Sequence, residues 1–315
     1  MIAHLDALGV INYQVLTIPG SDHSFSYWSV VKDQALAFLA DAFAEIPPPP
    51  PLPTPGPNDT TKKLLNVSTR AQVLDGDSVM VGGFILTGIT DKRVVLRGLG
   101  PSLSAFGLSG VLGDPYLELY DSAGFLMEAN NNRQVLNGIP NPLVPSNPLE
   151  SFLTAELPPG SYTTVLHGAT TGVGVGLVEL YDVDPVNSRV SNISTRGEVS
   201  AGALQMIGGF IIGGADQTSV IVRALGPSLA AAGVSAPLPD PVLELFDGNG
   251  NLMATNDNWR SSQEQEIINT GVPPANDLES AIVATLNPGH YTALVHDSQF
   301  RSGVALVEAY DLEPQ

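Results

Sequence analysis

Short runs of alternating apolar and polar residues fill the chain from about residue 60 to its end, and this pattern predicts β-strands. The runs lie at residues 78–86, 92–97, 116–120, 151–156, 162–167 and 176–181, with glycine, proline, asparagine and aspartate between them. Regular short strands separated by turn residues favour an antiparallel β-sandwich.

The same pattern occurs twice. Residues 66–70, 82–85 and 99–103 return 126 positions later as 192–196, 208–211 and 225–229, and residues 177–182 return 129 positions later as 306–311. A period this long is a whole domain, because solenoid repeats have about 20–50 residues. The sequence therefore predicts a mainly β fold with two tandem antiparallel β-sandwich domains, residues 60–186 and 187–315. We expect each to bury its own core and to be joined to the other only by residues 184–188.

The first 59 residues differ from the rest. Residues 13–18 are typical of a strand, and residues 29–44 of a helix. The helix has one apolar side, because its apolar residues recur at three- and four-residue steps: Val31, Ala35, Phe38, Leu39 and Ala42. Residues 46–59 are rich in proline and predict an extended linker. A short strand and helix fragment, residues 1–45, thus precedes the linker and the sandwiches.

The charge balance limits the partners. The chain has 13 basic and 32 acidic residues, which give it a net charge of -19. This negative charge repels phosphate backbones, so we expect no nucleic-acid partner. It has no apolar run of about 18 residues, so we expect no membrane span. It also has no cysteine. An acidic, cysteine-free chain rich in glycine and proline favours an extracellular location, although its N-terminus lacks the layout of a signal peptide.

Residues 1–45 resemble the C-terminal end of an α/β-hydrolase of the esterase or peptidase type. The resemblance rests on a strand, the string Pro-Gly-Ser-Asp-His-Ser-Phe at residues 19–25, and the closing amphipathic helix. It implies that His23 is the base of a catalytic triad. Such an enzyme needs a serine in the pattern Gly-x-Ser-x-Gly, which the chain lacks. Ser102 and Ser228 come nearest, but both follow a Gly-Pro pair that predicts a turn. We therefore expect no enzymatic activity from this chain.

The second half of each copy resembles the bacterial pre-peptidase C-terminal domain. The matching strings are residues 117–124 and 159–163 in the first copy, and 243–250 and 288–292 in the second. The resemblance implies a secreted β-sandwich of the kind appended to exoenzymes, which in some members binds calcium.

One loop has the oxygen-bearing side chains that calcium prefers. Asp247, Asn249 and Asn251 alternate around glycines, and Asp257 follows nearby. The terminal glutamate of an EF-hand is missing at its spacing, so an ordinary hairpin turn is the alternative. Calcium is the only cofactor that the sequence suggests.

Three other groups of residues are candidates. Trp259 lies in a polar loop and could stack on a sugar. Arg97 and its counterpart Arg223 alternate with apolar residues in strands, which predicts cross-strand pairing with a glutamate and leaves a catalytic Arg-Glu pair as the alternative. His167 and His296 stand at equivalent strand ends without a second ligand at metal-binding spacing, which favours a structural role.

The sequence thus favours a non-catalytic extracellular pair of β-sandwich modules for adhesion, substrate targeting or self-assembly. Its partner would be a cell-surface or polymeric substrate, or copies of itself. One alternative is the accessory C-terminal part of a secreted serine esterase or peptidase. Another is a subunit of an extracellular filament assembled by β-strand donation, with the strand around Val15 or Leu65 as the donor.

Overall fold

The computed structural model describes residues 63–75, 79–133, 143–170, 172–183, 189–200 and 205–312. The expected fragment 1–45, with His23, and the linker 46–59 lie outside the described residues.

Within the described residues the fold is mainly β, as the sequence predicts, with sixteen strands. The first copy contributes β1 (Lys63–Val73), β2 (Met80–Thr87), β3 (Lys92–Leu99), β4 (Pro115–Tyr120), β5 (Leu126–Asn130), β6 (Ser151–Leu157), β7 (Gly160–Gly168) and β8 (Gly174–Asp182). The second copy repeats this order as β9 (Arg189–Val199), β10 (Met206–Gly213), β11 (Thr218–Leu225), β12 (Pro241–Asp247), β13 (Leu252–Asn256), β14 (Ser280–Leu286), β15 (Gly289–Asp297) and β16 (Gly303–Asp311). Short helical turns are η2 (Pro101–Phe106), η4 (Pro227–Ala232), η5 (Trp259–Ser261) and α3 (Glu264–Asn269).

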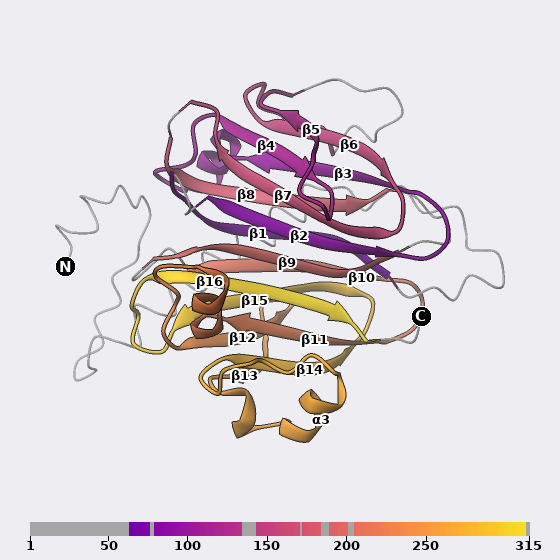
Figure 1. Ribbon diagram of the computed structural model, residues 1–315, viewed down its shortest axis with the longest axis vertical. Coiled ribbons are helices and arrows are strands. Elements are labelled where there is room, and N and C mark those ends of the chain that lie inside the picture. Colours follow the sequence, from indigo (N-terminus) through magenta and orange to yellow (C-terminus); the bar gives the residue numbers. More distant parts are fainter. Residues whose placement is uncertain are drawn as a thin grey trace.

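The strands form two layers that each contain strands of both copies (Figure 1). Layer I has the order β5-β4-β7-β2-β9-β16-β11-β14, and layer II has the order β6-β3-β8-β1-β10-β15-β12-β13. The two layers are linked by β1 and β9, which lie parallel and pair at only two positions, Leu64 with Val190 and Gln72 with Glu198. All other pairings between these strands are antiparallel.

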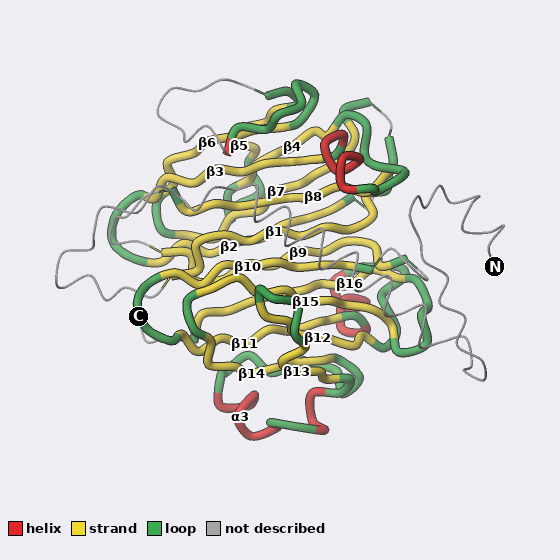
Figure 2. Tube along the Cα trace, turned by 180° about the vertical axis from the view of Figure 1, so that it is seen from behind, coloured by secondary structure: helices red, strands yellow, loops and turns green. Residues whose placement is uncertain are grey.

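The two copies join in the middle of each layer (Figure 2). In layer II, β1 of the first copy pairs with β10 of the second, for example Val67 with Phe210. In layer I, β2 of the first copy pairs with β9 of the second, for example Phe84 with Ile193. Because β10 repeats β2 and β9 repeats β1, both junctions use the same pair of strands.

The core follows from the alternation of the strands. In β2, buried and partly exposed residues alternate along the whole strand, so one face turns inward. One continuous cluster of buried apolar residues contains side chains of both copies, with Val67 and Phe84 from the first and Phe210 and Val307 from the second. The two copies therefore share one core.

This finding corrects the expected independence of the two copies. The ranges 60–186 and 187–315 still describe the duplication, since the strand order repeats within them. The copies are, however, not joined only by residues 184–188, because two antiparallel ladders and a common core connect them. Alternation along β1 specifies which side chains turn inward, but it does not specify which strand lies beside it.

Candidate functional site

The arginine cluster, Arg97 with Glu179 and Tyr181, is a charged group on the described strands that recurs in both copies. Arg97 on β3 and Glu179 on β8 are direct cross-strand partners. Arg97 Nε donates to Glu179 at 2.6 Å, and its other nitrogens donate to Tyr181 Oη and to the carbonyl of Leu143, both at 3.1 Å. All three cluster side chains are buried. The two charges pair with each other, and the tyrosine hydroxyl donates a hydrogen bond to Glu179.

The second copy repeats this cluster with Arg223, Glu308 and Tyr310. Arg223 pairs with Glu308, lies over the ring of Tyr310 at 5.1 Å, and donates to the carbonyl of Val272 at 2.7 Å. Burial, followed by the charge of Glu308, raises the pKa of Tyr310 to about 12. The sequence-based prediction of an Arg-Glu cross-strand pair is confirmed, and the partner is the glutamate of the last strand of each copy. In both clusters, the arginine side chain donates its hydrogen bonds to a neighbouring strand or loop. This arrangement is structural.

A buried glutamate holds the Leu-Gly-Pro-Ser-Leu motif of each copy. In the first copy, Glu150 accepts from the backbone N–H groups of Gly100 and Ser102 at 3.2 and 2.9 Å, and from the hydroxyl of Ser102 at 2.5 Å. In the second copy, Glu279 accepts from the equivalent groups of Gly226 and Ser228. Both glutamates are fully buried. The serine hydroxyls thus anchor a turn.

The glycine before this turn is needed for space. A Cβ on Gly100 would lie 2.0 Å from the carbonyl oxygen of Leu112, and one on Gly226 would lie 2.2 Å from that of Leu238. Any side chain here would displace the backbone of the neighbouring segment. The Gly-Pro pair predicts the turn correctly, but the pattern of the sequence gives no sign of the glutamate some 50 residues later, because a charged residue in a proline-rich loop is expected to face solvent.

The structure does not bring the four expected calcium ligands together. Asp247 closes the turn between β12 and β13, accepting from the N–H groups of Asn249 and Asn251 at 2.9 and 2.8 Å and from Asn251 Nδ2 at 2.9 Å. Asp257 follows the far end of β13, where Asn256 pairs with Leu243 at the start of β12. The described residues contain no group of three or more His, Cys, Asp or Glu that could hold a metal ion.

The first copy has the same turn with fewer polar side chains. Asp121 accepts from the N–H groups of Ala123 and Phe125, both at 2.9 Å. The hydrogen bonds of Asp247 therefore fit the hairpin-turn alternative, which both copies can form. Calcium at this loop stays a prediction.

Trp259 is not a sugar platform, which corrects the sequence-based expectation. The side chain is only 2% exposed and packs with Ile221, Ile267 and Ala281. Its indole N–H donates to the carbonyl of Asn276 at 3.2 Å, and Arg260 covers one face of the ring at 4.0 Å. The sequence does not indicate this burial, because the neighbours of Trp259 along the chain are polar. The ring is buried because the loop folds back over the outer side of β11 and β14.

The two strand-end histidines lie in different surroundings. His167 is partly exposed, lies 3.6 Å from a carboxylate oxygen of Glu118, and contacts the ring of Tyr116. His296 is buried, stacks on Phe300, and its Nδ1 lies 3.0 Å from the carbonyl oxygen of Asp297. Burial lowers the pKa of His296, although the adjacent carbonyl and Asp297 act in the opposite direction. Both are consistent with structural roles at strand ends.

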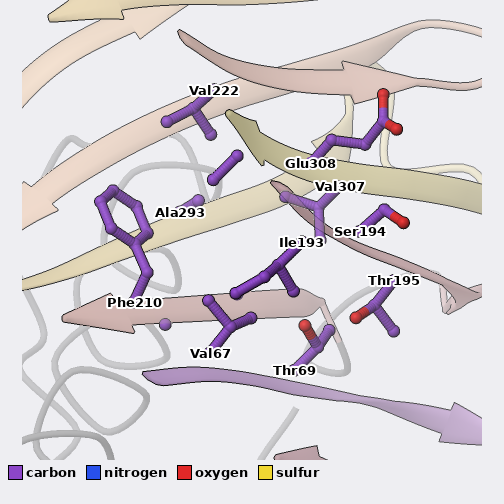
Figure 3. Close-up of a pocket in the computed structure, with 13 residues that line it drawn as sticks. Val67, Thr69, Ile193, Ser194, Thr195, Phe210, Val222, Ala293, Val307 and Glu308 are labelled. Carbon is purple, nitrogen blue, oxygen red and sulfur yellow. The ribbon is translucent and has the colours of Figure 1, made fainter. Parts of the chain in front are cut away.

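A small cavity of about 20 Å³ lies between the layers near the junction of the two copies (Figure 3). Val67 and Thr69 of β1 line it together with Ile193 and Thr195 of β9 and Val307 of β16. Thr69 Oγ1 is buried and has no hydrogen-bond partner among the described residues, so a single water molecule would fit its chemistry. The cavity is too small for an organic ligand.

Matching apolar residues are exposed at the two ends of the molecule. On β5, which pairs only with β4 within the described chain, Leu126 and Met127 are 54% and 48% exposed. On β13, which there pairs only with β12, Leu252 and Met253 are 50% and 48% exposed. We call these the edge pairs. Sequence reasoning missed them because a Leu-Met dipeptide in a strand predicts burial of at least one of its members.

No protein-family model matches this chain, and no curated protein matches it. Among solved structures, it is similar to a DUF4785 family protein from Legionella pneumophila, with 10% identity and a TM-score of 0.22 over 78% of this chain and 63% of that one. It is also similar to the STIV MCP, with 11% identity and a TM-score of 0.22 over 80% of this chain and 92% of that one. The chain thus spans less than two thirds of the Legionella protein.

In the described part of the chain, we find no helix with the length and apolar character needed to cross a membrane.

Proposed function

We propose that this chain is a non-catalytic, extracellular β-sandwich module that acts by surface contact, and that its main activity is self-assembly through its two ends. The observation that carries this proposal is the pair of equivalent edges, each with an exposed Leu-Met pair on a strand that has one free side in the described fold. Exposed apolar side chains on an edge strand favour association with another chain.

The repeated polar residues support a structural function. Arg97 and Glu179 hold two strands together, and Ser102 and Glu150 hold a turn. Side chains that are buried and hydrogen-bonded in this way stabilise the fold and are not directed at a substrate. Their recurrence in both copies fits a module whose function depends on its shape.

Because the molecule has two equivalent ends, its assembly can continue to grow by adding further molecules. If the β5 end of one molecule contacts the β5 end of the next, the β13 end of each stays available for a further molecule, so association does not stop at a dimer. This is the filament alternative of the sequence analysis, with edge contacts between folded sandwiches in place of a donated strand. Adhesion to a cell-surface or polymeric substrate would use the same edges.

Blocking one end at a time tests the proposal. We expect the full-length chain to grow beyond dimers with rising concentration in light scattering. The Leu126→Lys/Met127→Lys variant and the Leu252→Lys/Met253→Lys variant should each stop at dimers, and the variant with all four substitutions should be monomeric.

Ile89→Lys is the matched control, because Ile89 is 88% exposed and lies in the turn between β2 and β3, away from both edges. It should assemble like the unmodified chain. A monomer at every concentration, or unchanged assembly of the fourfold variant, would overturn the proposal.

The alternative of an accessory part of a secreted serine esterase or peptidase makes a different prediction. It rests on His23, which lies outside the described residues. Hydrolysis of p-nitrophenyl acetate that exceeds the rate of a His23→Ala variant would support it, whereas equal rates would support the non-catalytic module.

A further inference from the structure

The two exposed edges, which lie at opposite ends of the molecule (Figure 1), differ in charge at one position. Glu128 on β5 and Ala254 on β13 stand at equivalent places, each directly after the edge pair. Glu128 is the cross-strand partner of Leu119, and Ala254 is the cross-strand partner of Leu245. The register of the two ladders is otherwise the same. The molecule therefore holds one edge with a carboxylate and one without it.

Glu128 lies on the inward-facing side of its strand. Its partner Leu119 is fully buried, and residues directly opposite each other in an antiparallel pair share one face of the sheet. Ala254, in the same place on β13, packs against the common core. A charge that points inward on an edge strand is one of the devices by which natural sheets avoid pairing edge to edge.

The charge of Glu128 is not offset at the edge. Partial burial raises the pKa of this carboxyl group. A basic neighbour would act in the opposite direction, and none of the described residues contributes such an effect. Further loss of water, as another strand covers the edge, therefore acts on a carboxylate that has no positive partner.

At the other end, one of the two edge strands is already closed in the described fold. The side-chain amide of Gln263 donates to the carbonyl of Val283 on β14 at 2.9 Å, and its Oε1 accepts from the N–H of Val283 at 3.2 Å. Gln263 thus occupies both backbone groups of Val283, as a neighbouring strand would. The second strand of this end, β13, pairs only with β12 among the described strands.

The junctions inside the molecule show how edges of this unit pair. β1 of the first copy forms an antiparallel ladder with β10 of the second, and β2 forms one with β9. A two-fold contact between the β13 strands of two molecules would extend layer II in the same antiparallel way. It would bring together two sets of Leu252 and Met253, with the methyl group of Ala254 beside them.

The equivalent contact between two β5 strands is less favourable. In a two-fold contact the same patch is present on both sides, so both Glu128 carboxylates enter one short ladder. Like charges on paired strands repel, and each carboxylate also loses water. Phe125 adds apolar surface at this end, since it is 70% exposed. It lies in the turn before β5, however, where its carbonyl accepts from the N–H of Asp121, so a strand paired along β5 does not cover it.

We propose that Glu128 makes the two ends unequal in strength, so that molecules pair first through β13 and extend afterwards through β5. The partner at both ends is a second copy of this chain. This inference rests on the proposed function and adds the order in which its contacts form. The carboxylate then sets the concentration above which dimers grow into longer assemblies.

Variants with one open end measure the two contacts separately. The Leu126→Lys/Met127→Lys variant keeps the β13 end, and the Leu252→Lys/Met253→Lys variant keeps the β5 end. Analytical ultracentrifugation at pH 7 gives the dissociation constant of each dimer. We expect the dissociation constant to be roughly tenfold or more lower for the dimer formed through β13.

Exchanges at the one differing position identify the cause. Glu128→Gln, added to the variant that keeps the β5 end, should lower its dissociation constant roughly tenfold or more, because it removes the charge and keeps the shape. Ala254→Glu, added to the other variant, should raise its dissociation constant by a similar factor. Asp216→Asn is the matched control, because it removes one negative charge from an exposed turn between β10 and β11. It should leave both constants unchanged.

The outcomes separate this inference from the proposed function. Equal dissociation constants at the two ends, or a Glu128→Gln variant that dimerises no better than the Asp216→Asn control, would overturn the inference and leave self-assembly standing. Monomers of both one-ended variants at every concentration would overturn self-assembly and this inference with it. Each variant should first show the cooperative thermal unfolding of the unmodified chain, and Glu128→Gln decides the matter even where Ala254→Glu does not fold.

Discussion

Arg97 on β3 and Glu179 on β8 are direct cross-strand partners, and 2.6 Å separates the guanidinium Nε from the nearer carboxylate oxygen. Both side chains are buried, so removal of one leaves an uncompensated charge inside the protein. We expect Glu179→Ala to lower the free energy of unfolding by about 3–5 kcal/mol. Urea denaturation of the full-length chain measures this loss.

Two further variants distinguish charge pairing from simple loss of packing. Arg97→Met combined with Glu179→Leu should recover most of the stability, because apolar side chains replace both charges. Glu308→Ala should cost about as much as Glu179→Ala, since the second copy repeats the pair. A loss below about 1 kcal/mol for Glu179→Ala would place the pair among weak surface ion pairs.

Local sequence patterns predicted most of the strands, though not β5 and β13, and one polar pair. The alternation around Arg97 indicated a cross-strand glutamate, and the structure confirms Glu179 in that position. The duplication also predicted that Arg223 and Glu308 would behave in the same way. These features depend on periodicity within a strand and on repetition along the chain, both of which are visible in the sequence.

Features that depend on neighbours distant in the sequence were not predicted. The pairing of β1 with β10 requires knowledge of which edge each copy leaves open. Trp259 lies among polar residues yet is buried, because its loop folds over the outer side of a sheet. Glu150 is fully buried because backbone N–H groups some 50 residues away bind it.

The turn at Asp247 gives a prediction about calcium. Hydrogen bonds from the side chain and N–H of Asn251, and then from Asn249, lower the pKa of Asp247. These bonds already occupy both carboxylate oxygens, which favours the turn. We therefore expect Asp247→Ala to lower the melting temperature by the same amount with and without millimolar calcium. A calcium-dependent stabilisation that is lost in Asp247→Ala and kept in Asp121→Ala would instead establish a calcium site.

The same carboxylate gives a prediction about pH. Its pKa is lower in the folded protein than in the unfolded chain, so its contribution is present above the unfolded value of about 3.9 and is lost as the pH falls through the folded value. We expect the difference in melting temperature between the unmodified chain and Asp247→Asn to be constant above about pH 5 and to shrink below about pH 4. A difference that stays constant across this range would show that the charge does not stabilise the turn.

Ala71 and Gly197 occupy equivalent positions in the two copies and meet between the layers. A Cβ on Gly197 would lie 3.0 Å from the Cβ of Ala71 and 3.3 Å from the terminal methyl of Met206. Met206 can adjust, but the Cβ of Ala71 is fixed to the backbone of β1. We expect Gly197→Ala to destabilise the chain by about 1–3 kcal/mol, measured by urea denaturation.

Exchanging the two residues is the control. Ala71→Gly combined with Gly197→Ala keeps one methyl group between the layers and should recover most of the stability. Gly208→Ala offers a contrast, because its Cβ would meet Val307 at 3.4 Å beside the small cavity and should be tolerated or stabilising by up to about 1 kcal/mol. Equal losses for Gly197→Ala and Gly208→Ala would contradict the close contact with Ala71.

Separating the two copies tests the shared core. Residues 60–186 alone leave β1 and β2 without the partners β10 and β9, so apolar strands at the centre of the core become free edges. Because β10 repeats β2, a second molecule of the same fragment can supply the missing strand. With the edge pairs blocked by Leu126→Lys/Met127→Lys in 60–186 and by Leu252→Lys/Met253→Lys in 187–315, we expect each fragment to be a homodimer in light scattering, and an equal mixture of the two to form heterodimers. A folded monomer of either fragment with cooperative unfolding would show that one copy closes its own core.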